Sequence, residues 1–298
     1  MISLRFMPPR ETTEVEDTPD IEIVLRADRI RLSAKWLELW SYRDLFLILV
    51  WRDFAAKYKQ TVLGPLWFIL QPILMTVVFT VVFGLVGQLP TDGLPPLLFY
   101  QCGQLGWNYF AANLSANSAI FVNNGALFSK VYFPRLVVPL STIVSNLLPF
   151  LIQVLTFLSF FGYFKNILKI GTFGLDWRVV FLPFIVLQTA VLSLAFGLLF
   201  SALTAKYRDL VHLFGFLIQC WMYATPVILP LSKFPVNWQW VVALNPMTAI
   251  VESFRLMLLG TGTVRPEYEL CSLAITFVTL WVGFLLFSKV ERSFVDTV

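Results

Sequence analysis

The chain has 298 residues, of which 58% are hydrophobic and only 13% are charged, and its formal net charge at pH 7 is +4. A soluble domain of this composition would expose large apolar patches, so the composition excludes an ordinary soluble enzyme or binding module. Of the 22 basic and 18 acidic residues, ten of each lie before Gln60, so the positive balance does not indicate a nucleic-acid partner.

Residues 1–42 form a charged N-terminal extension. Its first 40 residues mix acidic and basic side chains and contain no apolar stretch, which argues against a cleavable signal peptide. We place this extension in the cytoplasm and assign it no role. Residues 293–298 are interpreted as a short cytoplasmic tail at the other end of the chain.

Residues 43–62 are predicted to form an amphipathic helix that lies on the cytoplasmic face of the membrane. On a helical wheel the apolar arc holds Leu47, Trp51, Phe54, Ala55, Tyr58 and Val62, and the polar side holds Arg52, Asp53, Lys57, Lys59 and Gln60. Cations on such a helix can bind a phosphate group, although a plain anchor helix is an equally good interpretation. Gly64 and Pro65 should end this helix at a sharp corner.

Six charge-free runs of at least 19 residues follow, and each is long enough to supply the roughly 18 to 20 apolar residues that cross a bilayer. We predict membrane-spanning helices over residues 63–86, 96–122, 136–163, 179–204, 210–229 and 270–288. With the N-terminus inside, 16 of the 22 Lys and Arg residues lie on the cytoplasmic side, which the positive-inside rule favours. The sequence therefore predicts an all-α integral membrane protein with a six-span domain over residues 63–292 and both termini in the cytoplasm.

Residues 230–269 are too short and too interrupted by proline and glycine to form two further spans. Glu252 and Arg255 lie three residues apart in this segment, so they can pair across one helical turn. Because ionisable groups at membrane depth usually pair with one another, we favour a structural clamp over a transport site.

No metal site is expected. The three cysteines, Cys102, Cys220 and Cys271, lie far apart in apolar runs and are interpreted as small buried hydrophobic residues. His212 is the only histidine and is interpreted as a helix-end or interfacial group rather than a proton relay.

Aromatic residues make up 16% of the chain. Most are expected in the belts at the two membrane interfaces and on lipid-facing surfaces. Others could line a transport path inside the protein. The candidates are Trp67, Phe68, Tyr100, Trp107, Tyr109, Trp221 and Tyr223.

Five short motifs occur in order along these elements. They are KYKQTVLGPLW at residues 57–67 followed by Gln71 and Pro72, NGALFSKVYFPR at 124–135 followed by Pro139, AKYRDL at 205–210, TPV at 225–227, and Asn245 and Pro246 leading to Glu252, Phe254 and Arg255. Over residues 44–292 the chain resembles the membrane subunits of ABC exporters for lipid-linked polysaccharides, which are the permeases for O-antigen, teichoic acid and capsule.

The resemblance implies a homodimer in the inner membrane, with each six-span protomer paired to a soluble ATPase and with re-entrant helices over residues 230–269. The chain has no G-x-x-x-x-G-K-S/T motif, so we expect ATP and Mg in the partner subunit and no cofactor in this chain. Residues 124–135 resemble the coupling helix that sits in a groove of the ATPase. A simple basic loop would explain its cations but not the aromatic residues between them. The expected contact residues are Phe128, Lys130, Tyr132, Phe133 and Arg135.

The resemblance thus implies the channel-forming subunit of an ATP-driven exporter for a lipid-linked polysaccharide. Arg52, Lys57 and Lys59 are expected to guide an anionic headgroup toward the corner at Gly64. The first and fifth spans are expected to meet at the dimer seam. Two alternatives stay open: a drug or small-lipid exporter of the same superfamily, and a membrane enzyme or flippase that needs no ATPase. An enzyme would call for clustered catalytic carboxylates, and the interior of the spans holds none.

Overall fold

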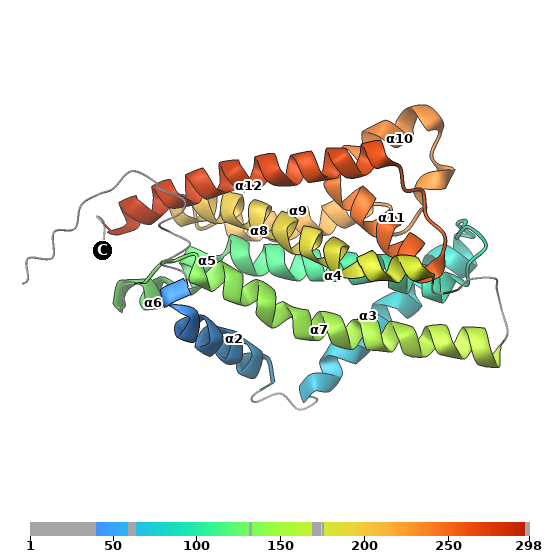
Figure 1. Cartoon of the computed structure of the whole chain (residues 1–298), viewed down its shortest axis with the longest axis horizontal. Helices are drawn as coiled ribbons and strands as arrows, with labels where there is room; N and C mark the ends of the chain where they lie inside the picture. The colour runs from blue at the N-terminus through green and yellow to red at the C-terminus, as the bar shows by residue number, and fades with distance from the viewer. Residues whose placement is uncertain (1–39, 59–63, 131–132, 169–173, 175, 296–298) are drawn as a thin grey trace, which may run out of the picture.

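The computed structural model describes residues 40–58, 64–130, 133–168, 174 and 176–295, which form a bundle of helices (Figure 1). No strand occurs among these residues, so the all-α fold class is confirmed for them. The α-helices are α2 (Arg43–Tyr58), α3 (Trp67–Phe79), α4 (Pro96–Ser118), α5 (Ile120–Asn123), α6 (Gly125–Lys130), α7 (Val137–Gly162), α8 (Leu182–Lys206), α9 (Leu210–Tyr223), α10 (Val236–Ala243), α11 (Pro246–Leu259) and α12 (Pro266–Val295). Short turns of other helix types are η1 (Gly64–Leu66), η2 (Thr80–Val86), η3 (Tyr163–Ile167), η4 (Trp177–Phe181) and η5 (Leu231–Lys233).

Four helical stretches are long and apolar enough to cross a bilayer, namely Trp67–Val86, Val137–Asn166, Trp177–Lys206 and Pro266–Glu291. A fifth crossing results if α10 and α11, which meet at a bend of 107°, count as one broken span. The other two predicted spans correspond to α4, whose 23 residues include several amide side chains, and to α9, which has 14 residues. The chain is therefore a multi-pass membrane protein, whereas the count of six spans stays a prediction.

Helix α4 lies at the centre of the bundle, and 16 of its 23 residues are buried. It packs against α3, α7, α8, α9 and α11, while α12 covers α8. The close approach of α11 depends on Gly106, because a Cβ added there would lie 2.9 Å from the ring of Phe254. Neighbouring helices rather than lipid surround α4. This position explains why α4 tolerates amide side chains that a lipid-facing helix would not.

Helices α2 and α3 stand partly outside this core. In α3 only Thr76 and Phe79 are buried, and the N-terminal end of the helix projects below α7 in Figure 1. Helix α2 packs against α7 and buries Leu49, whereas Leu47 and Trp51 of the expected apolar arc are exposed. A helix thus occurs where the sequence predicts one. Its amphipathic contact with the leaflet stays a prediction.

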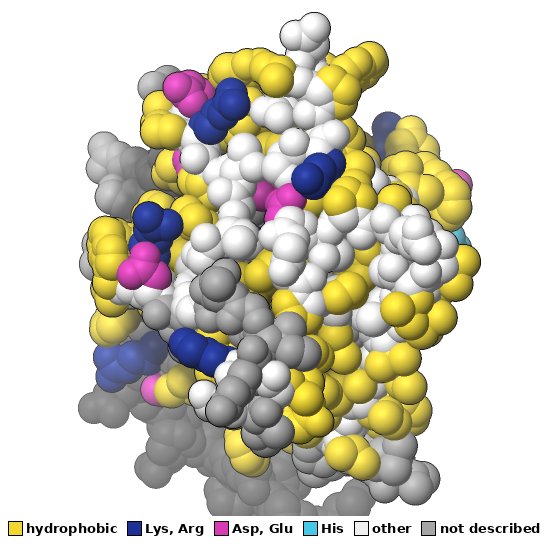
Figure 2. All heavy atoms as spheres, turned by 90° about the vertical axis from the view of Figure 1, so that its right-hand side faces the viewer, with side chains coloured by type: hydrophobic (Ala, Val, Ile, Leu, Met, Phe, Trp, Pro, Cys, Tyr) yellow, Lys and Arg dark blue, Asp and Glu magenta, His cyan; other side chains and the backbone are white. Residues whose placement is uncertain are grey.

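The segment between α9 and α12 folds back over one end of the bundle. Helix α11 is almost entirely buried and packs against α4 and α12, whereas α10 exposes Val236, Trp238 and Val241. Figure 2 shows this end of the molecule, where a few charged side chains lie scattered among hydrophobic and uncharged polar groups. The bend between α10 and α11 suits the re-entrant segment expected over residues 230–269, which stays a prediction.

Candidate functional site

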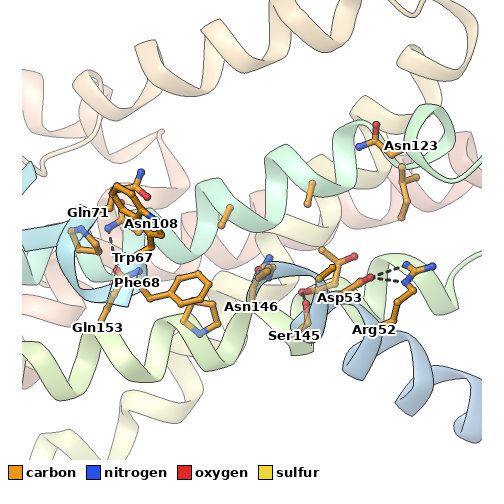
Figure 3. A pocket seen from close by; sticks show the side chains of 18 of the residues that line it. Arg52, Asp53, Trp67, Phe68, Gln71, Asn108, Asn123, Ser145, Asn146 and Gln153 are labelled. Carbon is orange, nitrogen blue, oxygen red and sulfur yellow. Dashed lines mark hydrogen bonds and ion pairs between the residues drawn. The ribbon is translucent and has the colours of Figure 1, made fainter. Parts of the chain in front are cut away.

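A cavity of about 790 Å³ lies between α2, α3, α4 and α7 (Figure 3). Its volume falls within the roughly 300–1,000 Å³ that small-molecule sites occupy. Charged side chains from α2 lie at one end, and aromatic and amide side chains lie at the other. The polar and aromatic lining consists of Arg52, Asp53, Lys57, Trp67, Phe68, Gln71, Asn108, Asn123, Asn124, Thr142, Ser145, Asn146 and Gln153.

At the charged end, Arg52 and Lys57 differ in their partners. The Arg52 guanidinium donates to Asp53 Oδ1 at 3.0 and 2.7 Å, so the carboxylate offsets its charge. Lys57 Nζ donates to Asn146 Oδ1, and Asn146 Nδ2 in turn donates to Asn113 Oδ1 at 2.7 Å. Burial lowers the pKa of Lys57, and the Asp53 carboxylate opposes this effect. Lys57 is thus a partly desolvated cation whose direct hydrogen bond goes to a neutral amide.

The other two members of the expected headgroup site are Lys59 and Gly64. Lys59 is outside the described residues. Gly64 has a φ of +50°, a left-handed conformation that glycine adopts without a steric cost. Residues 59–63 lie outside the described part of the chain, so the sharp corner that the sequence predicts before α3 stays a prediction.

At the far end of the cavity, aromatic rings and amides lie together. Trp67 and Phe68 begin α3, and 47% of the Trp67 surface is accessible. Asn108 Nδ2 of α4 donates to Gln153 Oε1 of α7 at 3.1 Å. Amides offer both donors and acceptors, so this end can bind a hydroxyl-rich molecule.

The amide groups of α4 are functional candidates that the sequence reasoning missed. Gln101, Gln104 and Asn108 follow one another at spacings of three and four residues, which places them on one face of a helix. Such a polar stripe inside an otherwise apolar run is a signal that the sequence itself carries.

The other aromatic candidates lie away from the cavity. Tyr100 and Trp107 are buried within the protomer, with 0% and 3% of their surfaces accessible. Trp221 packs edge-on against Trp107 and donates from Nε1 to Asn245 Oδ1 at 3.0 Å. Tyr223 is exposed on α9. Of the predicted aromatic residues, the structure thus brings the two from α3 to the cavity and places the others elsewhere.

The segment expected to meet an ATPase is held against α12. Phe128 and Phe133 are buried with their ring centroids 5.9 Å apart, and the Arg135 guanidinium lies 5.4 Å from the centroid of Phe128. The backbone N–H of Arg135 donates to Glu291 Oε1 at 3.2 Å, and its guanidinium donates to the Glu291 carbonyl at 3.0 Å. These three side chains face the body of the protomer. Tyr132 and the side chain of Lys130 lie outside the described part of the chain.

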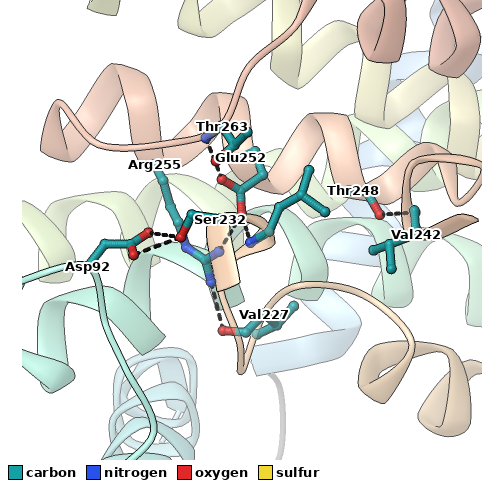
Figure 4. Close-up of polar contacts among 9 residues, drawn as sticks. Asp92, Val227, Ser232, Val242, Thr248, Glu252, Arg255 and Thr263 are labelled. Atoms are coloured by element: carbon teal, nitrogen blue, oxygen red, sulfur yellow. Dashed lines mark hydrogen bonds and ion pairs between the residues drawn. The ribbon is translucent and has the colours of Figure 1, made fainter. Parts of the chain in front are cut away.

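Glu252 and Arg255 form a fully buried ion pair, with Arg255 Nη1 2.9 Å from Glu252 Oε1 (Figure 4). The carboxylate also accepts from the backbone N–H groups of Leu231 at 3.2 Å and Thr263 at 2.8 Å. Arg255 Nη2 donates to the Val227 carbonyl at 2.8 Å. The pair thus ties three stretches between α9 and α12, at Val227, Leu231 and Thr263, to α11, which is the geometry of a clamp.

The described residues contain no group of three or more His, Cys, Asp and Glu side chains that could hold a metal ion. The cysteines are free: Cys102 is buried, Cys271 is partly buried and Cys220 is exposed.

Comparison with known proteins agrees with this architecture. The O-antigen export system permease protein RfbA of Myxococcus xanthus is 28% identical over 88% of this chain and 98% of its own length. RfbA of Klebsiella pneumoniae is 26% identical over 85% of this chain and 94% of its own length. The polysialic acid transport protein KpsM of Escherichia coli is 22% identical over 81% of this chain and 92% of its own length. The family model described as ABC-2 type transporter matches residues 44–259, well over half of the sequence, and the chain therefore belongs to this family.

Proposed function

We propose that this chain is the membrane subunit of an ATP-driven exporter that moves a lipid-linked polysaccharide across the inner membrane, with both termini in the cytoplasm. The names of the O-antigen and polysialic acid relatives support the proposal. The observation that carries it is the cavity between α2, α3, α4 and α7, which is charged at one end and lined by rings and amides at the other. A lipid-linked glycan has the same division between an anionic phosphate linkage and sugar rings.

Headgroup recognition is assigned to α2 and the corner that follows it. Lys57 is favoured as the primary contact, because a phosphate would supply the negative charge that its amide partner Asn146 lacks. Charge-assisted hydrogen bonds strengthen where water is scarce, and burial already lowers the pKa of this lysine. Arg52 and Lys59 would add to the site, with the headgroup turning into the membrane at Gly64.

The channel is proposed to form between two copies of the chain. In the single protomer α3 and α9 each bury only two residues, so most of their apolar side chains need cover from lipid or from another protein. A two-fold seam along these helices would place Trp67 and Tyr223 on one passage. Tyr100, Trp107 and Trp221 would take part only if the helices around α4 separate.

The energy is proposed to come from a separate ATPase that contacts residues 124–135. Arg135 hydrogen-bonds to Glu291 of α12, and Phe128 and Phe133 share a hydrophobic cluster with Phe287 of α12. A movement imposed on this segment would therefore reach α12 directly and α8 through it. Lys130 and Tyr132 stay proposed contacts with the ATPase.

Single cysteines test the passage. In a background that lacks Cys102, Cys220 and Cys271, cysteines at Trp67 and Tyr223 should react with a water-soluble thiol reagent during ATP turnover, and the reaction should block export. Phe277→Cys on α12 is a matched control, because Phe277 and Tyr223 are both 63% exposed in the single protomer. It should stay unreactive under lipid. Inert cysteines at both test positions, with normal export, would overturn the passage.

A further inference from the structure

A second, much smaller cavity of about 10 Å³ adjoins the large one inside the bundle. The two share the lining residues Phe68, Pro72, Asn108 and Gln153. The hydrogen bond from Asn108 to Gln153 therefore lies on their common border. The small cavity has room for about one water molecule or one hydroxyl group.

Two glutamines face this small cavity with unused hydrogen-bonding capacity. Gln104 Oε1 accepts from Thr76 Oγ1 at 3.2 Å, but Gln104 Nε2 has no partner, and neither has Gln101 Oε1. The two side chains are only 3% and 4% exposed. A buried amide without a partner is costly at membrane depth, so a polar group should occupy this place for at least part of the transport cycle.

The chemistry of the lining selects the kind of polar group. Amides and the Thr156 hydroxyl offer both donors and acceptors, as a sugar hydroxyl does, and the ring of Phe68 offers an apolar face. Among the described residues, none that lines the small cavity is ionisable, and the charged ones that line the large cavity all come from α2. A carboxylate or phosphate here would lose its hydration without gaining a cation.

We propose that Gln101, Gln104, Asn108 and Gln153 form a binding site for the hydroxyl groups of an uncharged sugar residue. The sugar ring lies in the large cavity beside Phe68. One hydroxyl breaks the hydrogen bond between Asn108 and Gln153 and enters between the two amides to reach Gln104 Nε2. The site deepens the proposed function, on which it rests, by making this exporter selective for glycans whose carrier-proximal sugars are neutral.

The first test compares matched amide replacements in the complex with its ATPase. Gln101→Met and Gln104→Met combined should reduce export of a neutral lipid-linked glycan at least tenfold, while ATPase stimulation by polyprenyl pyrophosphate without sugar stays unchanged. Gln188→Met is the control, because Gln188 is equally buried and also has an unpartnered Oε1, but it contacts Ser272 between α8 and α12. Normal export by the double variant would overturn the site.

The second test does not depend on export. Ala112 lines the large cavity one turn beyond Asn108, so a cysteine there reports on occupancy. Maltohexaose should slow its labelling by a water-soluble thiol reagent at least threefold, oligosialic acid should not, and Gln104→Met should remove the protection. Equal protection by both sugars, or protection that survives Gln104→Met, would overturn the selectivity for neutral sugars. If the unmodified complex exports no glycan although maltohexaose protects, the proposed function fails and the sugar site stands.

Discussion

Replacing Arg255 by methionine tests how firmly the stretches at Val227, Leu231 and Thr263 are held to α11. Both members of the pair with Glu252 are 1% exposed, and the charged atoms are 2.9 Å apart. At an effective dielectric constant of about 20 the attraction amounts to about 6 kcal/mol, and desolvation of the two ions offsets part of it. Methionine would leave the carboxylate buried with only the N–H groups of Leu231 and Thr263. We expect the free energy of unfolding to fall by about 3–5 kcal/mol.

The assay is the free energy of unfolding of the purified protein in bicelles, measured by steric trapping. Glu252→Gln, alone and combined with Arg255→Met, completes a double-mutant cycle, in which we expect a coupling energy of about 1–3 kcal/mol. Arg178→Met is the matched control, because Arg178 pairs with Asp176 at 3.5 Å on the surface and should cost less than about 1 kcal/mol. A loss below about 1 kcal/mol for Arg255→Met, or strictly additive single effects, would refute the clamp.

Gly197→Ala should lower the free energy of unfolding by about 1–3 kcal/mol, because the added Cβ would lie 2.6 Å from the Cβ of Asn117, whereas Gly162→Ala meets nothing within 4 Å. Equal effects of the two in the same unfolding assay would contradict the packing of α4 on α8. Phe133→Ala should uncouple ATP hydrolysis from export, since loss of a buried ring costs about 3–5 kcal/mol and loosens residues 124–135 from α12; normal hydrolysis with normal export would exclude this role. Lys57→Arg should extend headgroup-stimulated ATPase activity to higher pH, because lysine, with its pKa lowered by burial, loses its charge as the pH rises while arginine keeps it. Burial also favours the uncharged form of Lys57 in the folded protein. The contribution of Lys57 to the free energy of unfolding should therefore rise as the pH increases from the lowered pKa to the ordinary pKa of 10.5. Identical pH profiles of the two proteins would contradict the burial of this group.

The positions of the long helices could be predicted because a charge-free run in lipid must satisfy its backbone groups internally. The number of membrane crossings could not be predicted in the same way. Helix α4 carries its amides inside the bundle only because five other helices surround it, which is a property of the tertiary structure. Helix α9 ends at Tyr223 and is therefore shorter than its apolar run. Pro226 follows shortly after, and a proline disfavours the helical conformation of the residue before it.

The directions of the aromatic side chains were the least predictable part of the candidate site. Tyr100 and Trp107 belong to an apolar run that gives no sign of which face meets another helix. That face is set by α11, whose Phe254 packs against α4 at Gly106. The two residues are almost 150 positions apart in the sequence. Likewise, Arg135 turns inward because it hydrogen-bonds to Glu291. Glu291 lies 156 residues later in the chain, so local sequence does not reveal this contact. Contacts between such distant segments are not encoded in local spacing.

ATP-driven export of a lipid-linked glycan is tested most directly by reconstituting this chain with its ATPase in proteoliposomes. The measurement is the delivery of a lipid-linked neutral glycan to the opposite leaflet. We expect delivery that requires both the ATPase and hydrolysable ATP, and that stops when the ATPase cannot hydrolyse ATP. Delivery without ATP would indicate a flippase that needs no ATPase. ATP-driven movement of drugs or small lipids, with the glycan-bearing lipid left in place, would contradict the account as well.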